Sequence, residues 1–474
     1  MRAATPTIVR ELRRILNEAS IPDIVDARYL ADQTEARGLV GTADAVALPA
    51  SAEDACAVVA WCYAHDVAVI PRGGGTGFAG GCVPLNGGVV LSLERLRSLR
   101  SFDPLLWRME VEAGRTTAEV AQLARENGLY FPPDPGAAEQ SQIGGNVATN
   151  AGGPHSFKYG VTGHWVTGLE AVVAPGELIK IGGAVRKDVA GYDLKSLLVG
   201  SEGTLGIVTS VWLRLTPAPE AAAPVIGFYS SVAAGCAAIE RALGSGISVA
   251  ALEFLDAETI AIASATLPGR LREPAFVVVG EVDGASDEIR TLQAELVEAL
   301  AEDAVTTLAP NAPAEVSALW RWRDGVSIAV QAYRGGKASE DIVVPIDRLA
   351  EAIEATHDLG RRFDLPACSW GHAGDGNLHS TFMLDRDAPA EAVRAHAAAE
   401  ELFALAAALG GSISGEHGVG VVKNGQLSRQ WDPRAIELHA AIKRVFDPKC
   451  LLNPGKKIAA PAGLGDQAAA SATR

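Results

Sequence analysis

The sequence lacks clustered cysteines. Six cysteines are spread over 474 residues, and no two of them form a C-x-x-C pair. Because iron–sulfur clusters and zinc ribbons need grouped thiolates, this spacing argues against both within this chain. Scattered cysteines in a long chain are typical of a reduced, cytoplasmic protein.

Excess positive charge and long apolar runs are also missing. The net charge of −16 argues against non-specific binding to nucleic acid or to an anionic membrane surface. No stretch has the ~20 apolar residues of a membrane-spanning helix, and the amphipathic N-terminus lacks the apolar core of a signal peptide. We therefore expect a cytoplasmic protein with no transmembrane segment. Peripheral attachment at the inner face of the membrane is the alternative.

The pattern along the chain predicts two domains and a tail. Residues 1–217, with a core from about 40 to 217, combine glycine-rich segments with short strands. After a proline-rich stretch at 213–224, residues 218–457 alternate long Ala/Leu/Glu helices with strands. This predicts an α+β domain whose antiparallel sheet is covered on one side by helices. Residues 458–474, rich in small and polar types, are predicted to be a disordered tail.

Glycine, in contrast, is abundant, and much of it lies in three segments, at 72–77, 143–153 and 200–206. Successive glycines permit positive φ and let backbone N–H groups converge on a pyrophosphate. The first segment matches neither the dinucleotide-binding nor the P-loop pattern. A tight turn explains one such segment equally well. All three together predict a wall around a large ligand that has a phosphate and a flat heterocycle.

In this order, P-R-G-G-G-T-G, I-G-G-N-V-A-T-N-A-G-G and S-E-G-T-L-G-I resemble the FAD domain of the vanillyl-alcohol-oxidase and p-cresol-methylhydroxylase type. The resemblance implies that the first segment holds the pyrophosphate, that 133–136 and 144–150 lie along the flavin and ribityl chain, and that 203–207 lies near the adenine. The implied FAD contacts are Arg72, Gly73, Gly74, Gly75, Thr76, Gly77, Pro133, Asp134, Gly144, Gly145, Asn146, Thr149, Asn150, Gly203 and Ile207. Covalent members usually bind FAD through a histidine in or near the first glycine loop. None occurs there, so we predict non-covalent FAD.

Two histidine-containing segments supply candidate catalytic groups. In G-H-A-G-D-G-N-L-H, the central Gly-Asp-Gly-Asn predicts a turn between strands that brings His372 and His379 together. Glu416 and His417 follow, flanked by glycines. Two histidines and a carboxylate with open coordination positions suit a divalent metal such as Zn, Mn or Fe. If only His372 and His379 are considered, a structural role is a serious alternative. The presence of Glu416 and His417 favours a functional role for the whole set.

The other histidines lack such a setting. We expect surface or structural roles for His155, His164, His357, His396 and His439.

Residues from about 220 to 457 resemble the C-terminal domain of FAD-linked oxidases, through W-R-W-R (320–323), E-D-I-V-V-P (340–345) and L-N-P-G-K (452–456). That family includes D-lactate dehydrogenase, the flavin subunit of glycolate oxidase and D-2-hydroxyglutarate dehydrogenase. The resemblance implies that His372, His379 and Glu416 bind the metal. It also implies that His417 removes the substrate's hydroxyl proton, that Arg323 binds its carboxylate and that hydride passes to flavin N5.

The size of the substrate depends on one strand. Ser339 stands where relatives acting on dicarboxylates place a lysine, which favours a small D-2-hydroxy acid such as D-lactate or glycolate, although Lys337 lies two residues earlier. The alternatives are a D-2-hydroxyglutarate-type dicarboxylate dehydrogenase, an alkyl-glycerone-phosphate-synthase-like non-redox flavoenzyme, a subunit of a larger oxidoreductase and a metal-dependent hydrolase. Without cluster-binding cysteines, electrons would leave to oxygen, a quinone, a cytochrome or a separate iron–sulfur partner.

Overall fold

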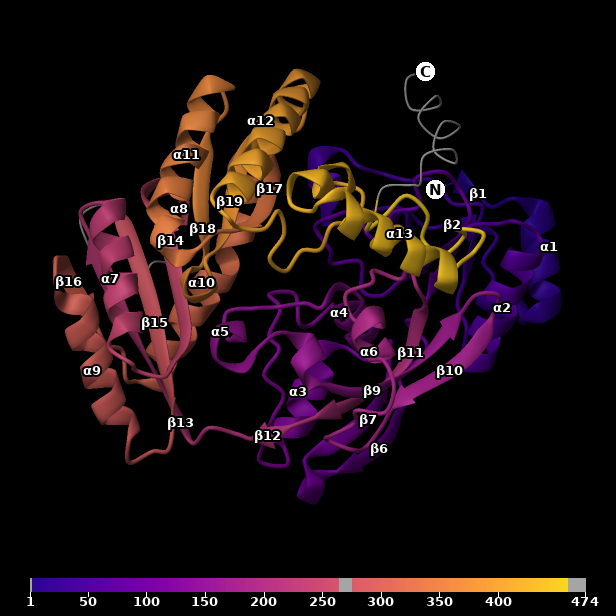
Figure 1. Cartoon of the computed structure of the whole chain (residues 1–474), viewed down its shortest axis with the longest axis horizontal. Coiled ribbons are helices and arrows are strands. Elements are labelled where there is room, and N and C mark those ends of the chain that lie inside the picture. Colours follow the sequence, from indigo (N-terminus) through magenta and orange to yellow (C-terminus); the bar gives the residue numbers. More distant parts are fainter. Residues whose placement is uncertain (1, 264–274, 459–474) are drawn as a thin grey trace.

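The computed structural model describes residues 2–263 and 275–458. Figure 1 shows the N-terminal part, in indigo to magenta, beside a C-terminal part built around one large sheet. The last helix, α13 (Pro433–Phe446), crosses back to the N-terminal part. Apart from Ile458, the predicted tail lies outside the described residues.

The N-terminal part begins with a small parallel sheet in the order β3-β5-β4. Its strands are apolar and almost fully buried, and Ser51 caps the covering helix α2 by accepting from the backbone N–H of Asp54 at 3.0 Å. The elements of this layer are α1 (Pro6–Ile15), β3 (Ala45–Ala47), α2 (Ala52–Ala64), β4 (Val69–Arg72) and β5 (Val89–Ser92). The first glycine segment therefore starts at the end of β4.

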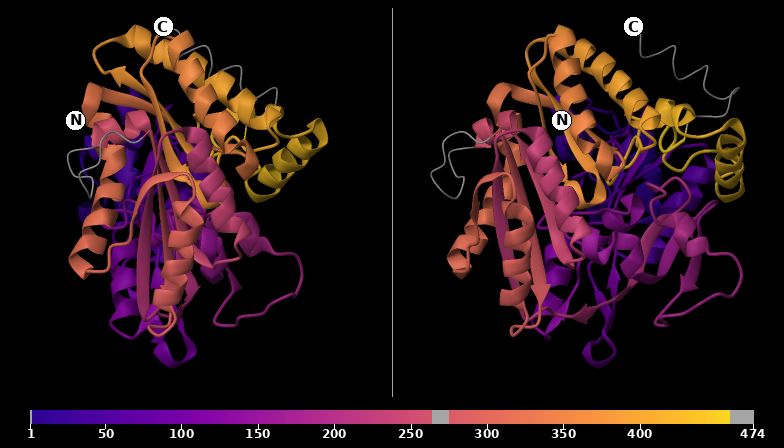
Figure 2. Two further views of the ribbon diagram at one scale, coloured as in Figure 1. Left: turned by 90° about the vertical axis from the view of Figure 1, so that its left-hand side faces the viewer. Right: turned by 60° about the vertical axis from the view of Figure 1, so that its left-hand side comes forward.

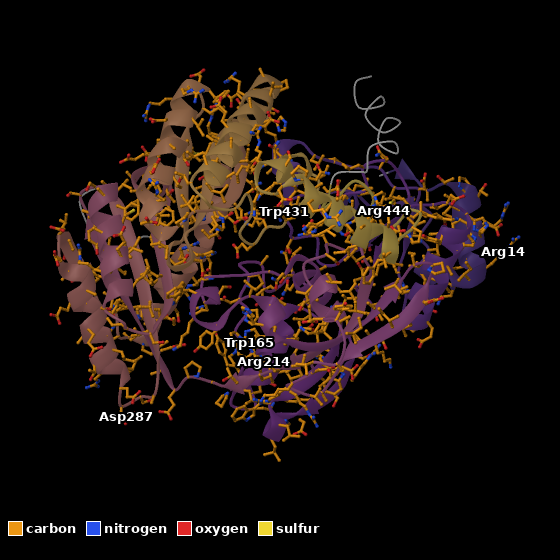
Figure 3. The ribbon with its side chains drawn as sticks, in the orientation of Figure 1. Arg14, Trp165, Arg214, Asp287, Trp431 and Arg444 are labelled. Carbon is orange, nitrogen blue, oxygen red and sulfur yellow. The ribbon has the colours of Figure 1, made fainter. Side chains whose placement is uncertain are left out.

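A second, antiparallel sheet completes the N-terminal part, in the order β10-β9-β11-β7-β6. Helices α3 (Thr117–Arg125) and α4 (Ile143–Thr149) pack on it, and a reciprocal capping box between Thr116 and Glu119 begins α3. At its surface Arg214 lies 4.8 Å from the ring of Trp165 (Figure 3). The strands are β6 (Leu99–Asp103), β7 (Arg108–Glu112), β9 (Val166–Val173), β10 (Glu177–Gly182) and β11 (Ile207–Arg214).

The C-terminal part is built on a seven-stranded sheet in which every neighbouring pair is antiparallel, in the order β16-β13-β15-β14-β18-β19-β17. The strands are β13 (Ala221–Tyr229), β14 (Val249–Asp256), β15 (Phe276–Gly284), β16 (Ala304–Leu308), β17 (Gly335–Val343), β18 (Ala367–His372) and β19 (Asn377–Asp385). Two strands near one end, β18 and β19, carry the predicted histidines.

Helices cover both faces of this sheet, so the expectation of a one-sided cover is wrong. One face packs against α7 (Val232–Gly244), α9 (Ile289–Ala301), α11 (Leu349–Arg362) and α12 (Pro389–Ala408). The other packs against α8 (Ala257–Ala263) and α10 (Pro313–Arg334). The run Phe276–Val279 explains this, because successive residues alternate between the two clusters and all are buried. Uninterrupted apolar strands are typical of sheets covered on both faces.

The end of the described chain packs against the N-terminal part, and the right-hand view of Figure 2 shows the last helix, in yellow, beside it. Leu452 forms a parallel bridge with Val69 of β4. Lys443 donates to the carbonyl of Thr204 at 2.7 Å, and Asn453 donates to the carbonyl of Gly81 at 2.8 Å. Glu416 and His417 lie in the segment between α12 and α13, and this segment therefore runs from the C-terminal part to the N-terminal part.

Candidate active site

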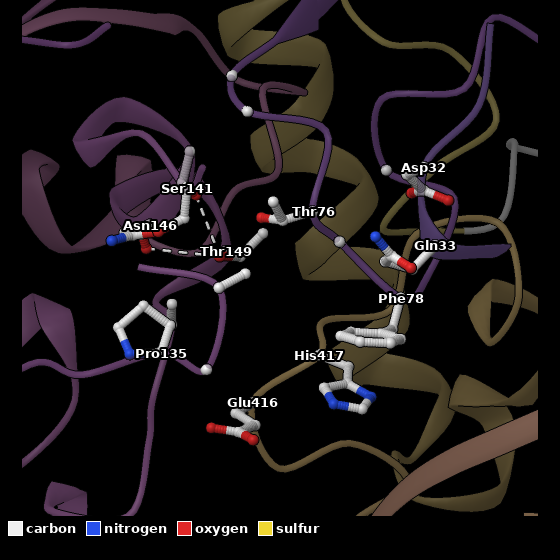
Figure 4. Close-up of a pocket in the computed structure, with 18 of the residues that line it drawn as sticks. Asp32, Gln33, Thr76, Phe78, Pro135, Ser141, Asn146, Thr149, Glu416 and His417 are labelled. Atoms are coloured by element: carbon white, nitrogen blue, oxygen red, sulfur yellow. Dashed lines mark hydrogen bonds between the residues drawn. The ribbon is translucent and has the colours of Figure 1, made fainter. Parts of the chain in front are cut away.

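A cavity of about 550 Å³ lies between the N-terminal part and the large sheet. Its wall includes most of the predicted cofactor residues: Arg72, Gly73, Gly74, Gly75, Thr76, Gly77, Gly144, Gly145, Asn146, Thr149, Gly203 and Ile207. Pro133, Asp134 and Asn150 are not on it, whereas Pro135 and Gly136 are. Sequence reasoning also missed the polar stretch 139–142 and Asp32, which line the cavity (Figure 4).

Glycine is required at two positions of the cavity wall, one in the first glycine segment and one in the second. A Cβ on Gly74 would lie 2.1 Å from the carbonyl oxygen of Gln140, and one on Gly144 would lie 2.6 Å from the Cβ of Ala113. Because these glycines have no side chain, their backbone itself lies on the cavity wall, where backbone groups can bind the phosphates of a dinucleotide. The guanidinium of Arg72 packs against Gly75 of the loop and donates to the carbonyl of Ala31 at 2.9 Å, so it connects the loop to the segment that holds Ala31.

The turn between β18 and β19 brings the predicted histidines together. His372 ends β18, a 3₁₀ turn and Gly376 at φ +66° follow, and His379 lies in β19 opposite Trp370. Glu416 reaches between the two imidazoles, with its Oε1 3.2 Å from Nε2 of His372 and 3.6 Å from Nε2 of His379. The two imidazoles thus lie close together across the turn, and Glu416 joins them from a distant part of the sequence.

Glu253, which sequence reasoning missed, orients His372. Its carboxylate is fully buried in β14 and accepts from Nδ1 of His372 at 2.6 Å. Its other oxygen forms an ion pair with Arg323, so Arg323 is anchored at the cavity wall by an acid. Burial alone lowers the pKa of His372, but the carboxylates of Glu253 and Glu416 outweigh it and raise that pKa well above its usual value. The only feature of the sequence that pointed to Glu253 was the presence of an acidic residue inside an apolar strand.

His417 lies flat between two rings. It stacks on Phe78 at 4.5 Å between centroids and on His379 at 5.0 Å, with interplanar angles of 21° and 6° (Figure 4). Burial lowers the pKa of His417 and lowers that of His379 to about 3. Burial alone would raise the pKa of Glu416, but the neighbouring histidines, His372 first, lower it to about 2. The pKa values therefore leave the rings of His379 and His417 neutral beside an ionised Glu416, so the ring of His417 can accept a proton, whereas the raised pKa of His372 favours its charged form.

A second buried carboxylate, Asp341, holds the loop that carries these groups. Its Oδ2 accepts from the backbone N–H groups of residues 415–417 at 2.8–3.0 Å and from the hydroxyl of Ser414 at 3.0 Å. Its Oδ1 accepts from the side-chain amide of Asn377 at 2.6 Å. Asp341, His379 and His417 are also close enough to share an ion. Because Asp341 is already engaged by so many donors, His372, His379 and Glu416 form the better ligand set.

His155 bridges the two parts. It lies on the N-terminal side, with Nδ1 2.5 Å from Oδ2 of Asp134 and Nε2 2.9 Å from Oε1 of Glu281 in β15. The indole N–H of Trp320 donates to the same Glu281 at 2.6 Å. Burial alone lowers the pKa of His155, but the two acids outweigh it and raise the pKa to about 11. Asp134 therefore serves this bridge rather than the cavity wall.

The fold and cavity define a flavoprotein oxidoreductase with a p-cresol-methylhydroxylase-type FAD-binding fold. Residues 43–182 match the FAD binding domain family, and residues 218–457 match the family described as FAD linked oxidases, C-terminal domain. The chain belongs to the FAD-linked oxidases, within the group of D-lactate, glycolate and D-2-hydroxyglutarate enzymes. This confirms the predicted family, fold class and cofactor FAD.

Named relatives span nearly the whole chain. Glycolate oxidase subunit GlcD of Bacillus subtilis is 36% identical, covering 88% of this chain and 89% of that protein. D-lactate dehydrogenase of Anaerostipes hadrus is 34% identical, covering 86% and 87%. D-2-hydroxyglutarate dehydrogenase of Xanthomonas citri is 38% identical, covering 87% and 88%.

Solved structures show the same fold. The p-cresol methylhydroxylase structure has a TM-score of 0.79 at 17% identity, covering 96% of this chain and 97% of that one. An alkyldihydroxyacetonephosphate synthase has a TM-score of 0.74 at 18% identity, covering 95% and 84%. Among the described residues, no helix combines the length and apolar character needed to cross a bilayer.

Proposed function

We propose that this chain oxidises a small D-2-hydroxy acid of the D-lactate or glycolate class to the 2-oxo acid. The observation that carries the proposal is that one cavity contains both the glycine-lined cofactor wall and the His372, His379, Glu416 and His417 cluster. Relatives named for glycolate oxidase and D-lactate dehydrogenase match 88% and 86% of this chain.

The protein's part is to orient the substrate and to take a proton. His417 is half-buried and its pKa is lowered, so the neutral ring accepts the hydroxyl proton near neutral pH. Arg323 faces the cavity while Glu253 fixes its guanidinium, which suits it to bind the substrate's carboxylate. FAD, when bound, supplies the acceptor for the hydride from Cα. We expect it to be held non-covalently, and acid precipitation should release the yellow colour.

A divalent metal fits the donor set. The three ligand atoms of His372, His379 and Glu416 lie within 4.8 Å of one another, and Glu253 fixes the His372 ring with Nε2 toward Glu416. These residues would hold Zn, Mn or Fe, which would supply a Lewis acid that lowers the pKa of the substrate's hydroxyl.

A specific observation favours a second candidate, D-2-hydroxyglutarate. Lys337 and Ser339 are two residues apart on β17 and so share one face of the strand. The buried Lys337 donates to the hydroxyl of Ser327, a cavity residue, at 2.6 Å and lies 5.7 Å from the ring of Trp370. Burial lowers the pKa of Lys337 to about 8, so an ammonium is available near the cavity at neutral pH. A distal carboxylate is the group it would bind.

The deciding experiment is anaerobic mixing of the FAD-loaded protein with D- and L-lactate, glycolate and D- and L-2-hydroxyglutarate. Bleaching of the flavin by one D-acid or by glycolate is expected, and His417→Asn should bind FAD yet not be reduced. His396→Asn, a change at an exposed helix residue, is the matched control. If no hydroxy acid bleaches the flavin, the redox proposal is wrong and the non-redox synthase class is favoured. The electron acceptor, among oxygen, a quinone, a cytochrome and an iron–sulfur partner, is identified by supplying each to the reduced protein.

A further inference from the structure

The loop at 414–420 is held by two buried carboxylates that come from opposite sides of the cavity. Asp341, from the large sheet, binds its first half through the backbone amides of residues 415–417. Glu202, from the third glycine segment, binds its second half. We propose that Glu202 is a positioning residue that sets Glu416 and His417 against the cofactor wall. The roles of Glu416 and His417 rest on the function proposed above.

The grip of Glu202 is specific. Its Oε1 accepts from the backbone N–H of Val419 at 2.8 Å, and its Oε2 accepts from that of Gly420 at 2.6 Å. A Cβ on Gly418, at φ +80°, would lie 2.9 Å from Oε1, so the carboxylate approaches where only glycine leaves room. Hydrogen bonds from backbone amides to an ionised acid are roughly twice as strong as neutral ones.

Glu202 itself is fixed to the cofactor wall. Its backbone N–H donates to the carbonyl of Ala148 in α4 at 2.7 Å, and its carbonyl accepts from the side chain of Asn453 at 2.7 Å. Its neighbour Gly203, at φ +71°, packs so closely on Pro71 that a Cβ would lie 2.3 Å from that ring. Through its backbone and side chain, Glu202 therefore connects the second and third glycine segments to the loop that carries the proton acceptor.

This connection matters because the loop has no regular structure of its own. His417 is two residues from Val419, so loss of the two bonds loosens the second half of the segment while Asp341 still holds the first. The bonds that remain there act further along, from Lys457 to the carbonyl of Gly420 at 3.0 Å and from Val421 to the carbonyl of Ala79 at 2.9 Å. The stacking of His417 on Phe78 belongs to the same arrangement, since Phe78 follows the first glycine segment. A displacement of ~1 Å at a catalytic group can cost about 100-fold in rate. Glu202 thus sets where the acceptor nitrogen lies relative to the cofactor.

The first test is the rate of flavin reduction by the active hydroxy acid in Glu202→Gln and Glu202→Ala, both loaded with FAD. Glutamine keeps one acceptor and turns an NH₂ toward the other amide, so we expect kcat to fall about 10- to 100-fold. KM and FAD content should change little, and alanine should lower kcat further. Lys457→Gln is the matched control, since the side chain of Lys457 pairs with Glu202 at 3.3 Å. The contact of Lys457 with the loop, to the carbonyl of Gly420 at 3.0 Å, comes from its backbone N–H, which glutamine keeps. This variant should keep kcat near that of the unaltered protein.

The second test does not depend on activity. Hydrogen exchange of the 414–422 peptide should accelerate in Glu202→Gln but not in Lys457→Gln, with the 367–382 hairpin unchanged. Normal kcat and unchanged exchange in Glu202→Gln would overturn the proposal. If the unaltered protein oxidises no hydroxy acid, the proposed function fails separately, and exchange alone decides whether Glu202 positions the loop. Should Glu202→Ala not fold, the glutamine variant carries both tests.

Discussion

Glutamine in place of Glu253 removes the charge on which Arg323 and His372 both depend. The side chain of Glu253 is fully buried, and its two oxygens face the guanidinium and Nδ1 of His372. Removing one member of a buried ion pair costs about 3–5 kcal/mol, because the other charge stays buried without a partner. We therefore expect Glu253→Gln to lower the free energy of unfolding by roughly that amount.

The same change tests the metal set. An acid that fixes a metal-binding histidine typically contributes 10- to 100-fold in affinity, which is about 1.4–2.7 kcal/mol. Glu253→Gln should weaken Zn²⁺ or Mn²⁺ binding by that factor, measured by competition with a chelator in FAD-loaded protein.

Asp256→Asn is the matched control. Asp256 is a buried acid on the same strand, and it accepts from Nε2 of His357 at 2.9 Å, away from the cavity. It should destabilise the protein without changing metal affinity at His372, His379 and Glu416. Asp256, Glu258 and His357 also lie close enough to share an ion, so any ion lost in this variant alone is assigned to that second set. If Glu253→Gln loses stability but binds metal like the unaltered protein, His372 is not a ligand and the histidines act on the substrate directly.

Three other changes give distinct results. An added Cβ in Gly77→Ala meets only Asp32, at 3.6 Å, whereas Gly74→Ala meets the backbone of Gln140 at 2.1 Å. The first should weaken FAD binding in a folded protein and the second should also lower Tm; equal Tm values would contradict this. His155→Gln should lower the free energy of unfolding by about 3–5 kcal/mol at pH values below ~6.5, where His155 is charged in both the folded and the unfolded protein. Because the pKa of His155 in the folded protein is about 11, this difference should shrink as the pH rises toward 11. A difference in urea unfolding that is constant with pH would refute that bridge. Lys337→Met should spare D-lactate or glycolate oxidation and abolish any activity on D-2-hydroxyglutarate, and loss of both would assign Lys337 to the fold.

Part of the site followed from local sequence. The Gly-Asp-Gly-Asn turn indicated that His372 and His379 can converge, because a tight turn between strands brings their flanking residues side by side. In the hairpin His372 pairs with Asn377 and His379 with Trp370, and the two imidazole centroids lie 5.2 Å apart. The glycine segments were equally informative, since close backbone approaches demand glycine at particular positions.

The carboxylates that organise the site could not be predicted. Glu253 lies 119 residues from His372, and Glu202 lies 217 residues from Val419. Nothing in the local pattern pairs them, because the packing of one part against the other decides which amides and rings a buried acid meets. His155 shows the same limit, and its bridge to Glu281 also explains why Asp134 faces away from the cavity.

The bridge between Val69 and Leu452 has a consequence for biosynthesis. During translation, β4 leaves the ribosome long before its partner does. At ~5–20 residues per second the edge of β4 stays uncovered for roughly 20–80 s. An open strand edge invites pairing with other chains, so the nascent protein is most prone to aggregate in that interval. A residue synthesised late therefore protects the edge of a sheet whose strands were all synthesised early.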